Sequence, residues 1–203
     1  MRVACCTYYS PSHKQLADIC LPNLSEYCSR HGYYMWVQNI ENDKWEYVKH
    51  EMFKELFEKG FDAIWYRDID SVVTNMKIKV TDLIQSEHHF FITRDFNELN
   101  GGSVVIKNTK VGRSFNDLIL WQKKDFQNEQ NAYNFWAKYL EPSLIKVLPH
   151  PSINSYDYSL YPECENVRSI YQGHWREGDF VLHTPGLGFE KRIEVLKNAK
   201  ITR

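Results

Sequence analysis

The sequence lacks the features of a membrane-spanning or disulfide-rich protein. No stretch of its 203 residues approaches the ~18 consecutive apolar residues of a transmembrane helix. The stretch 1–10 is too aromatic for a signal peptide, and its apolar part is too short. No Cys-x-x-Cys pair occurs among the five cysteines, which are Cys5, Cys6, Cys20, Cys28 and Cys164. We therefore expect reduced, buried cysteines, no disulfide framework or zinc site, and a cytoplasmic location.

Net charge is also nearly absent. The 25 Lys and Arg residues are balanced by 26 Asp and Glu residues, which gives a formal charge of −1 at pH 7. Because no global field would attract a polyanion, we expect no nucleic-acid partner. Aromatic residues, in contrast, make up 15% of the chain, and their flat faces suit sugars or bases as well as ordinary core packing.

The apolar pattern predicts a single α/β domain over residues 1–203. Period-two runs alternate with period-3.6 runs, an order typical of a mixed, mostly parallel central sheet flanked by helices. Pro22 is expected to kink the first helix or to start a second segment, and Thr81 is expected to cap a short helix. The expected strands are 2–9, 33–38, 63–66, 88–93, 101–107, 143–149 and 179–184. The expected helices are 13–32, 44–60, 79–85, 111–124, 128–140 and 188–200.

Asp68 and Asp70 follow a buried strand directly, at the kind of sheet edge where α/β proteins bind ligands. Residues two apart in extended chain point the same way, so the two carboxylates can converge. Converging anions repel each other unless a cation lies between them. Mn²⁺ or Mg²⁺ is the natural occupant, with open positions for a phosphate-bearing ligand. A solvated turn is the alternative interpretation of this short motif.

Further polar blocks follow other predicted strands. His183 ends the last strand, where a core or surface histidine is the alternative to a metal ligand. Gly186 would let backbone N–H groups approach a phosphate, and Lys191 would face a diphosphate. Two adjacent glycines at 101–102 open a strand, and Glu129 with Gln130 begins a helix. The glycines indicate either close approach of a flat ligand or a tight turn. Glu129 and Gln130 indicate either polar groups in the cleft or a favourable first-turn charge.

Taken in order, these blocks resemble the GT-A fold glycosyltransferases, most closely the galactosyl-, mannosyl- and xylosyltransferase family that makes yeast outer-chain mannan and plant xyloglucan branches. The resemblance covers residues 2–192. The blocks contain Trp45 with Lys49, Asp68 with Asp70, Asn100 with Gly102 and Ser103, Glu129 with Gln130, Asn154 to Tyr156, and Gly178 to Gly186.

The chain also departs from the family pattern. Members usually carry an N-terminal membrane anchor and a stem, and they often have an acidic residue where this chain has Asn128. The compact form resembles sugar transferases of large algal viruses, in which such a domain can be the first part of a longer polypeptide.

The resemblance implies a metal-dependent, retaining transfer of sugar from a UDP-sugar to a hydroxyl of a glycan or glycoprotein acceptor. Asp68, Asp70 and His183 would hold Mn²⁺ or Mg²⁺. The residues expected to bind the nucleotide sugar are Thr7, Tyr8, Tyr9, Lys49, Asp68, Arg94, Gly102, Gly186 and Lys191. The expected catalytic residues are Gln130, Glu129 and Asp95.

Several alternatives stay open. Inversion with Glu129 or Asp157 as the base competes with retention. A nucleotidyltransferase, or a nucleotide-sugar-binding module without catalysis, competes with the transferase. The nucleotidyltransferase is disfavoured because no glycine follows the first strand. The binding module is disfavoured because Asp68, Asp70 and His183, called the metal set below, are all present. The aromatic residues expected to contact the acceptor are His150, Tyr156, Tyr158 and Trp175.

Overall fold

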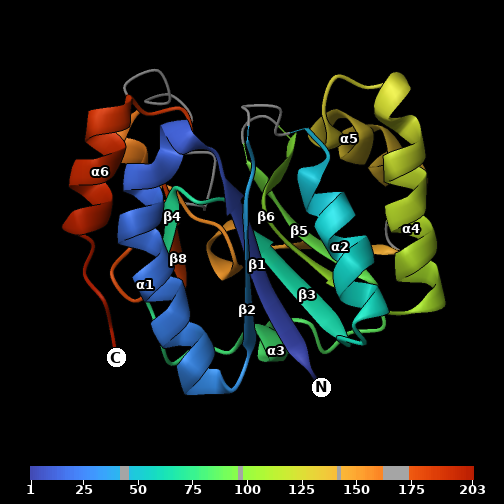
Figure 1. The fold of residues 1–203 in the computed structure, drawn as a ribbon, viewed down its shortest axis with the longest axis horizontal. Helices are drawn as coiled ribbons and strands as arrows, with labels where there is room; N and C mark the ends of the chain where they lie inside the picture. The colour runs from blue at the N-terminus through green and yellow to red at the C-terminus, as the bar shows by residue number, and fades with distance from the viewer. Residues whose placement is uncertain (42–45, 96–97, 141–142, 162–173) are drawn as a thin grey trace.

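A six-stranded sheet with the order β2-β1-β3-β6-β5-β7 forms the centre of the molecule (Figure 1). The computed structural model describes residues 1–41, 46–95, 98–140, 143–161 and 174–203. The strands of this sheet are β1 (Val3–Tyr9), β2 (Tyr34–Asn39), β3 (Ala63–Arg67), β5 (Phe90–Asp95), β6 (Glu98–Lys107) and β7 (Ile145–Leu148). Strand β6 runs antiparallel to its neighbours β3 and β5, whereas β1 pairs in parallel with β2 and β3, and β5 with β7. The predicted mostly parallel sheet is confirmed.

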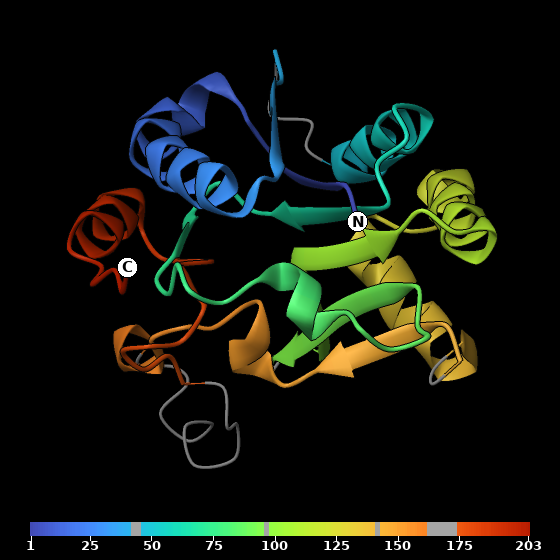
Figure 2. The same ribbon diagram turned by 90° about the horizontal axis from the view of Figure 1, so that it is seen from below.

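Helices cover both faces of the sheet. Helices α1 and α6 lie side by side on one face, and α2, α4 and α5 lie on the other (Figures 1 and 2). The α-helices are α1 (Lys14–His31), α2 (Val48–Glu58), α3 (Val80–Leu83), α4 (Lys110–Trp121), α5 (Glu129–Leu140) and α6 (Phe189–Lys197). Short 3₁₀ helices occupy Pro11–His13, Gln122–Lys124, His150–Ser152 and Tyr158–Leu160.

The alternation within β1 shows how the sequence builds two apolar layers. Val3 and Cys5 pack on the α1 side, whereas Ala4 and Cys6 pack on the α2 side. This division follows from the strand geometry, because successive side chains point to opposite faces. Both faces are covered, so the strand reads as a continuous apolar run.

A second sheet brings distant parts of the chain together. Strand β4 (Ser71–Val73) pairs antiparallel with β8 (Val181–His183) in a two-stranded sheet separate from the main one. In this register Ser71 lies opposite His183. The sequence predicted β8 but not its partner.

Two local expectations are corrected. Pro22 lies inside α1 and does not start a second segment; the helix ends at His31 and is capped by Gly32, which has a left-handed φ of 67°. Thr81 lies inside α3 and does not cap it; its hydroxyl is instead 3.0 Å from the hydroxyl of Tyr33.

The cysteines that the structure describes are buried, as expected. Cys5, Cys6, Cys20 and Cys28 are free thiols in the interior. Cys164 lies outside the described residues, as does Trp45. Within the described ranges, no helix combines the length and the apolar character needed to cross a membrane.

A buried histidine connects the helices on the α2 face. Nδ1 of His50 is 2.6 Å from Oδ1 of Asn116, and its Nε2 is 2.5 Å from the hydroxyl of Tyr133. Burial lowers the pKa of His50 from 6.5 to about 4. The ring is therefore neutral in the folded protein over most of the physiological range.

The lowered pKa of His50 predicts that the free energy of unfolding depends on pH. The unfolded imidazole takes up a proton near pH 6.5, whereas the folded one stays neutral down to about pH 4. Because the unfolded state then binds more protons, the free energy of unfolding decreases as the pH falls, by about 3 kcal/mol for a shift of this size. Urea denaturation at several pH values should show this loss in the wild type and not in His50→Gln. The same pH dependence in both proteins would contradict the assignment.

Candidate active site

A cavity of about 520 Å³ lies at the edge where β1 and β3 end. Six of the site residues predicted from the sequence line it: Tyr8, Tyr9, Asp68, Asp70, His183 and Gly186. Its other lining residues are Ser10, Ser12, His13, Ile40, Tyr66, Ile69, Pro185 and Arg192. The rule that ligands bind beyond the carboxyl ends of the strands therefore located the cavity correctly.

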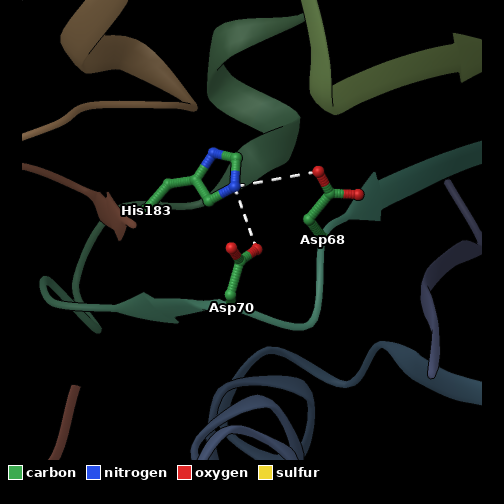
Figure 3. Close-up of side chains that lie close together, drawn as sticks. All are labelled: Asp68, Asp70 and His183. Carbon is green, nitrogen blue, oxygen red and sulfur yellow. Dashed lines mark hydrogen bonds and ion pairs between the residues drawn. The ribbon is translucent and has the colours of Figure 1, made fainter. Parts of the chain in front are cut away.

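Asp68, Asp70 and His183 point toward one another on the wall of this cavity (Figure 3). Nε2 of His183 is 3.0 Å from Oδ1 of Asp70 and 3.7 Å from Oδ2 of Asp68. One ligand atom from each residue lies within 4.8 Å of the other two. The aspartates come from the turn between β3 and β4, and the pairing of β4 with β8 brings the imidazole to them.

These residues fit a divalent cation. Two carboxylates and an imidazole are a donor set that Mn²⁺ accepts well, and Mg²⁺ less readily. Gly102 closes the site from the side of β6. A Cβ atom at that position would lie 2.4 Å from Cε1 of His183 and 2.9 Å from Oδ2 of Asp68. The backbone of β6 therefore packs directly against two of the three prospective ligands.

The charges in the site are arranged around Asp70. Its Oδ2 is 3.2 Å from Nη1 of Arg192. Burial opposes its ionisation, but His183 and Arg192 together lower the pKa of Asp70 below its usual value. Burial likewise opposes a charge on His183, but the carboxylates of Asp70 and Asp68 raise the pKa of the imidazole. Asp70 is thus an ionised acceptor at neutral pH.

Hydrogen bonds from Arg67 stabilise the turn that contains Asp68 and Asp70. This buried guanidinium donates to the hydroxyl of Ser71 at 3.0 Å and to the backbone oxygen of Cys20 at 3.1 Å. Ser71 in turn donates to the backbone oxygen of Asp68 at 2.6 Å, and the Tyr66 hydroxyl donates to Oδ1 of Asp68 at 2.5 Å. Arg67 therefore fixes the turn and does not line the cavity.

A second polar group lies beside the cavity, on the other side of β6. Nζ of Lys49 is 2.7 Å from Oε1 of Glu129 and donates to the backbone oxygen of Gly101 at 2.7 Å. Oε1 of Gln130 accepts from the backbone N–H of Gly101 at 3.0 Å. Burial alone would raise the pKa of Glu129, but the ammonium of Lys49 lowers it. Lys49, Glu129 and Gln130 thus stabilise the β6 backbone at Gly101, next to the residue that contacts the metal set.

Eight predicted residues do not line the cavity. Lys49, Gly102, Glu129 and Gln130 are the residues at and beside β6 already described, and the other four lie elsewhere. Thr7 is buried on β1, and Arg94 is exposed on β5. Asp95 is buried and accepts hydrogen bonds from two other side chains. The side chain of Lys191 is 46% exposed, and its ammonium lies 3.1 Å from Glu194.

Arg192 occupies the place expected for Lys191. It lines the cavity, and its Nε donates to the backbone oxygen of Leu187 at 2.7 Å. The sequence showed a basic pair at the start of a helix but not which member turns inward. The serines and the histidine at positions 10, 12 and 13 were also missed, although they follow β1 at the same sheet edge.

The aromatic residues expected to contact the acceptor glycan lie largely in the protein interior. Tyr156 is 1% exposed and Tyr158 is fully buried, so neither ring can stack on a sugar and that prediction is wrong for both. His150 is buried against the same two rings. Trp175 is half-buried and donates to the hydroxyl of Thr74 at 3.3 Å.

Comparison with solved structures supports the fold. The chain superposes with a TM-score of 0.77 on a glycosyltransferase involved in the glycosylation of the major capsid of PBCV-1, with 16% identity over 97% of this chain and 99% of that chain. It matches the glycosyltransferase GlyE of Streptococcus pneumoniae TIGR4 with a TM-score of 0.65 and 12% identity, over 98% of this chain and 60% of that chain. The predicted GT-A fold is confirmed.

Comparison with known sequences gives the family. An alpha-1,2-galactosyltransferase of Schizosaccharomyces pombe is 26% identical to 95% of this chain, and the match spans 62% of that protein's length. Residues 2–88 and 84–194 match the pattern of a single family, so nearly the whole chain is covered. The chain therefore belongs to the galactosyl transferase GMA12/MNN10 family.

Proposed function

We propose that the chain is a metal-dependent glycosyltransferase that moves a sugar from a UDP-sugar to a hydroxyl of a glycan acceptor, with retention of configuration. The observation that carries the proposal is the convergence of Asp68, Asp70 and His183 on the wall of a cavity lined by Tyr8 and Tyr66. Family membership favours the same reaction class.

The cavity divides into parts with different chemistry. Tyr8 and Tyr9 at the end of β1 offer stacking faces and backbone groups to the base and ribose. Mn²⁺ or Mg²⁺ held by the metal set would act as a Lewis acid toward the departing diphosphate. Gly186, with a left-handed φ of 72°, lies beside this position and exposes backbone to a phosphate.

Retention is favoured by what the candidate bases do in the structure. Glu129 is buried, and its Oε1 is paired with the ammonium of Lys49. Asp157 accepts from the N–H and hydroxyl of Ser159 and does not line the cavity. We assign Glu129 and Gln130 to holding Gly101 beneath the anomeric carbon.

Arg192 supplies the positive charge for the diphosphate in this account. A charge-assisted hydrogen bond contributes roughly 1.5–3 kcal/mol, so Arg192→Ala should lower kcat/KM for the donor by about 10- to 100-fold. Lys191→Ala is the matched control, because this neighbouring lysine points to solvent and pairs with Glu194. Steady-state kinetics with varied donor concentration would test the pair. An equal loss in both variants, or a loss only in Lys191→Ala, would contradict the assignment.

A donor screen tests the proposed function. The protein with Mn²⁺ is incubated with individual nucleotide sugars, starting with UDP-galactose because of the relative's name, and free UDP is measured. We expect hydrolysis of one UDP-sugar, faster when an acceptor glycan is added. Pyrophosphate formation from UTP and a sugar 1-phosphate, without any cleavage of UDP-sugars, would instead identify a nucleotidyltransferase.

A further inference from the structure

A chain of buried hydrogen bonds runs from β6 to the imidazole of the metal set. The backbone N–H of Gly102 donates to Oδ1 of Asn100 at 2.8 Å. Nδ2 of Asn154 donates to the same Oδ1 at 2.9 Å. Oδ1 of Asn154 then lies 2.9 Å from Nδ1 of His183. Asn154 and its partners are almost completely shielded from solvent.

The orientation of the first amide follows from its neighbours. A backbone N–H can only donate, so the Asn100 atom facing Gly102 must be the oxygen. The other end of this amide, Nδ2, faces Oδ2 of Asp95 at 2.8 Å. This oxygen of Asp95 accepts the bond, so both ends of Asn100 agree on one orientation.

This orientation passes to the second amide. Because the oxygen of Asn100 can only accept, the Asn154 atom that reaches it must be the nitrogen. The Asn154 oxygen therefore faces His183. The Tyr156 hydroxyl, 3.3 Å from Nδ2 of Asn154 and 3.1 Å from Oδ2 of Asp95, closes the network.

The contact between Asn154 and His183 decides which imidazole nitrogen carries no proton. Facing an amide oxygen, Nδ1 of His183 must carry a proton, and a neutral ring then has its lone pair on Nε2. Nε2 is the atom that faces Asp70 and Asp68. Without Asn154, the carboxylate of Asp70 at 3.0 Å would favour the opposite tautomer, with a proton on Nε2 and no lone pair toward an ion.

We propose that Asn100 and Asn154 are positioning residues that keep the proton on Nδ1 of His183 and so present Nε2 to the divalent cation. The inference rests on the proposed function for the ion itself. It gives a role to Asp95 as well, which anchors Asn100 from within the protein instead of contacting the donor sugar.

The ring proton can be observed directly. In protein carrying ¹⁵N-labelled histidine, without metal and with diamagnetic Mg²⁺, the wild type should show a slowly exchanging proton on Nδ1 of His183. The signal is assigned by its absence in His183→Gln. A bare Nδ1 in the wild type would overturn the proposal, and this spectrum decides the question even where a variant does not fold.

Two variants separate positioning from general packing. Asn154→Leu removes the acceptor for Nδ1–H and should weaken Mn²⁺ binding, measured by electron paramagnetic resonance, by about 10- to 100-fold. Asn154→Asp retains an acceptor there, so it should keep the Nδ1 proton and bind Mn²⁺ more tightly than Asn154→Leu. Equal Mn²⁺ affinity in Asn154→Leu and the wild type would overturn the proposal.

The positioning role and the proposed function can fail separately. A wild type that has its only ring proton on Nε2 yet binds Mn²⁺ would overturn the positioning role and leave the proposed function intact. A wild type that carries the Nδ1 proton but binds no Mn²⁺ would overturn the proposed function, and the positioning role with it.

Discussion

Asp70→Asn is expected to lower sugar transfer by about a thousandfold, since a metal ion contributes several kcal/mol to stabilising the leaving group. Asp70 is buried, and its two oxygens face His183 and Arg192, so it lies at the centre of the site's charges. The amide has the same shape but no charge. It therefore removes an anionic ligand while retaining an oxygen for one hydrogen bond. The rate of UDP release in the presence of acceptor measures the effect.

A matched change of charge provides the control. Asp18→Asn alters a carboxylate on the exposed side of α1 that pairs with Lys14, a surface lysine of the same helix. Such pairs contribute little, so this variant should transfer sugar at the wild-type rate. Circular dichroism should show both variants folded. A folded, active Asp70→Asn protein would remove the basis of the metal assignment.

Gly102→Ala is expected to be nearly as damaging, although it adds only a methyl group. The new Cβ would lie 2.4 Å from Cε1 of His183 and 2.9 Å from both Oδ1 of Asn100 and Oδ2 of Asp68. Each neighbour is held by hydrogen bonds, so relief requires moving the imidazole or β6 itself. A displacement of about 1 Å at a catalytic centre can cost roughly a hundredfold in rate. We therefore expect about a hundredfold loss of transfer, with Mn²⁺ binding weakened in parallel.

Gly188→Ala is the control for this substitution. Gly188 precedes α6 with an ordinary φ of −56°, and a Cβ there would meet no atom within 4 Å. Its transfer rate and Mn²⁺ affinity should match the wild type. Thermal unfolding separates a local effect from a general loss of stability, since overpacking commonly costs about 1–3 kcal/mol. Normal Mn²⁺ binding by Gly102→Ala would show that the close contacts relax without consequence.

The sequence predicted the parts of the fold that depend on local pattern. The alternation in β1 and the helical period of α2 and α4 follow from which faces are buried, so their positions were predicted to within a few residues. Antiparallel β6 and the separate β4–β8 sheet were not predicted. Residues 71–73 and 181–183 pair over a long separation, and only the packing of the whole chain selects that register.

The same distinction applies to the site. Asp68 and Asp70 were identified because strand periodicity puts them on one side at a sheet edge. Lys191 and Arg192 differ by one position on α6, and a helix turns about 100° per residue, so a small uncertainty in where the helix begins exchanges their roles. Asn154 follows β7 in a loop whose path no period describes. Its contact with His183 therefore emerged only in three dimensions.

The proposed function requires a divalent ion between Asp68, Asp70 and His183 that binds the diphosphate of the donor. A crystal of the protein with MnCl₂ and UDP, measured at the manganese absorption edge, tests this most directly. We predict one strong anomalous peak in contact with Asp70, with Nε2 of His183 and with the UDP phosphates. UDP bound in the cavity without a peak there, or a peak remote from these side chains, would contradict it.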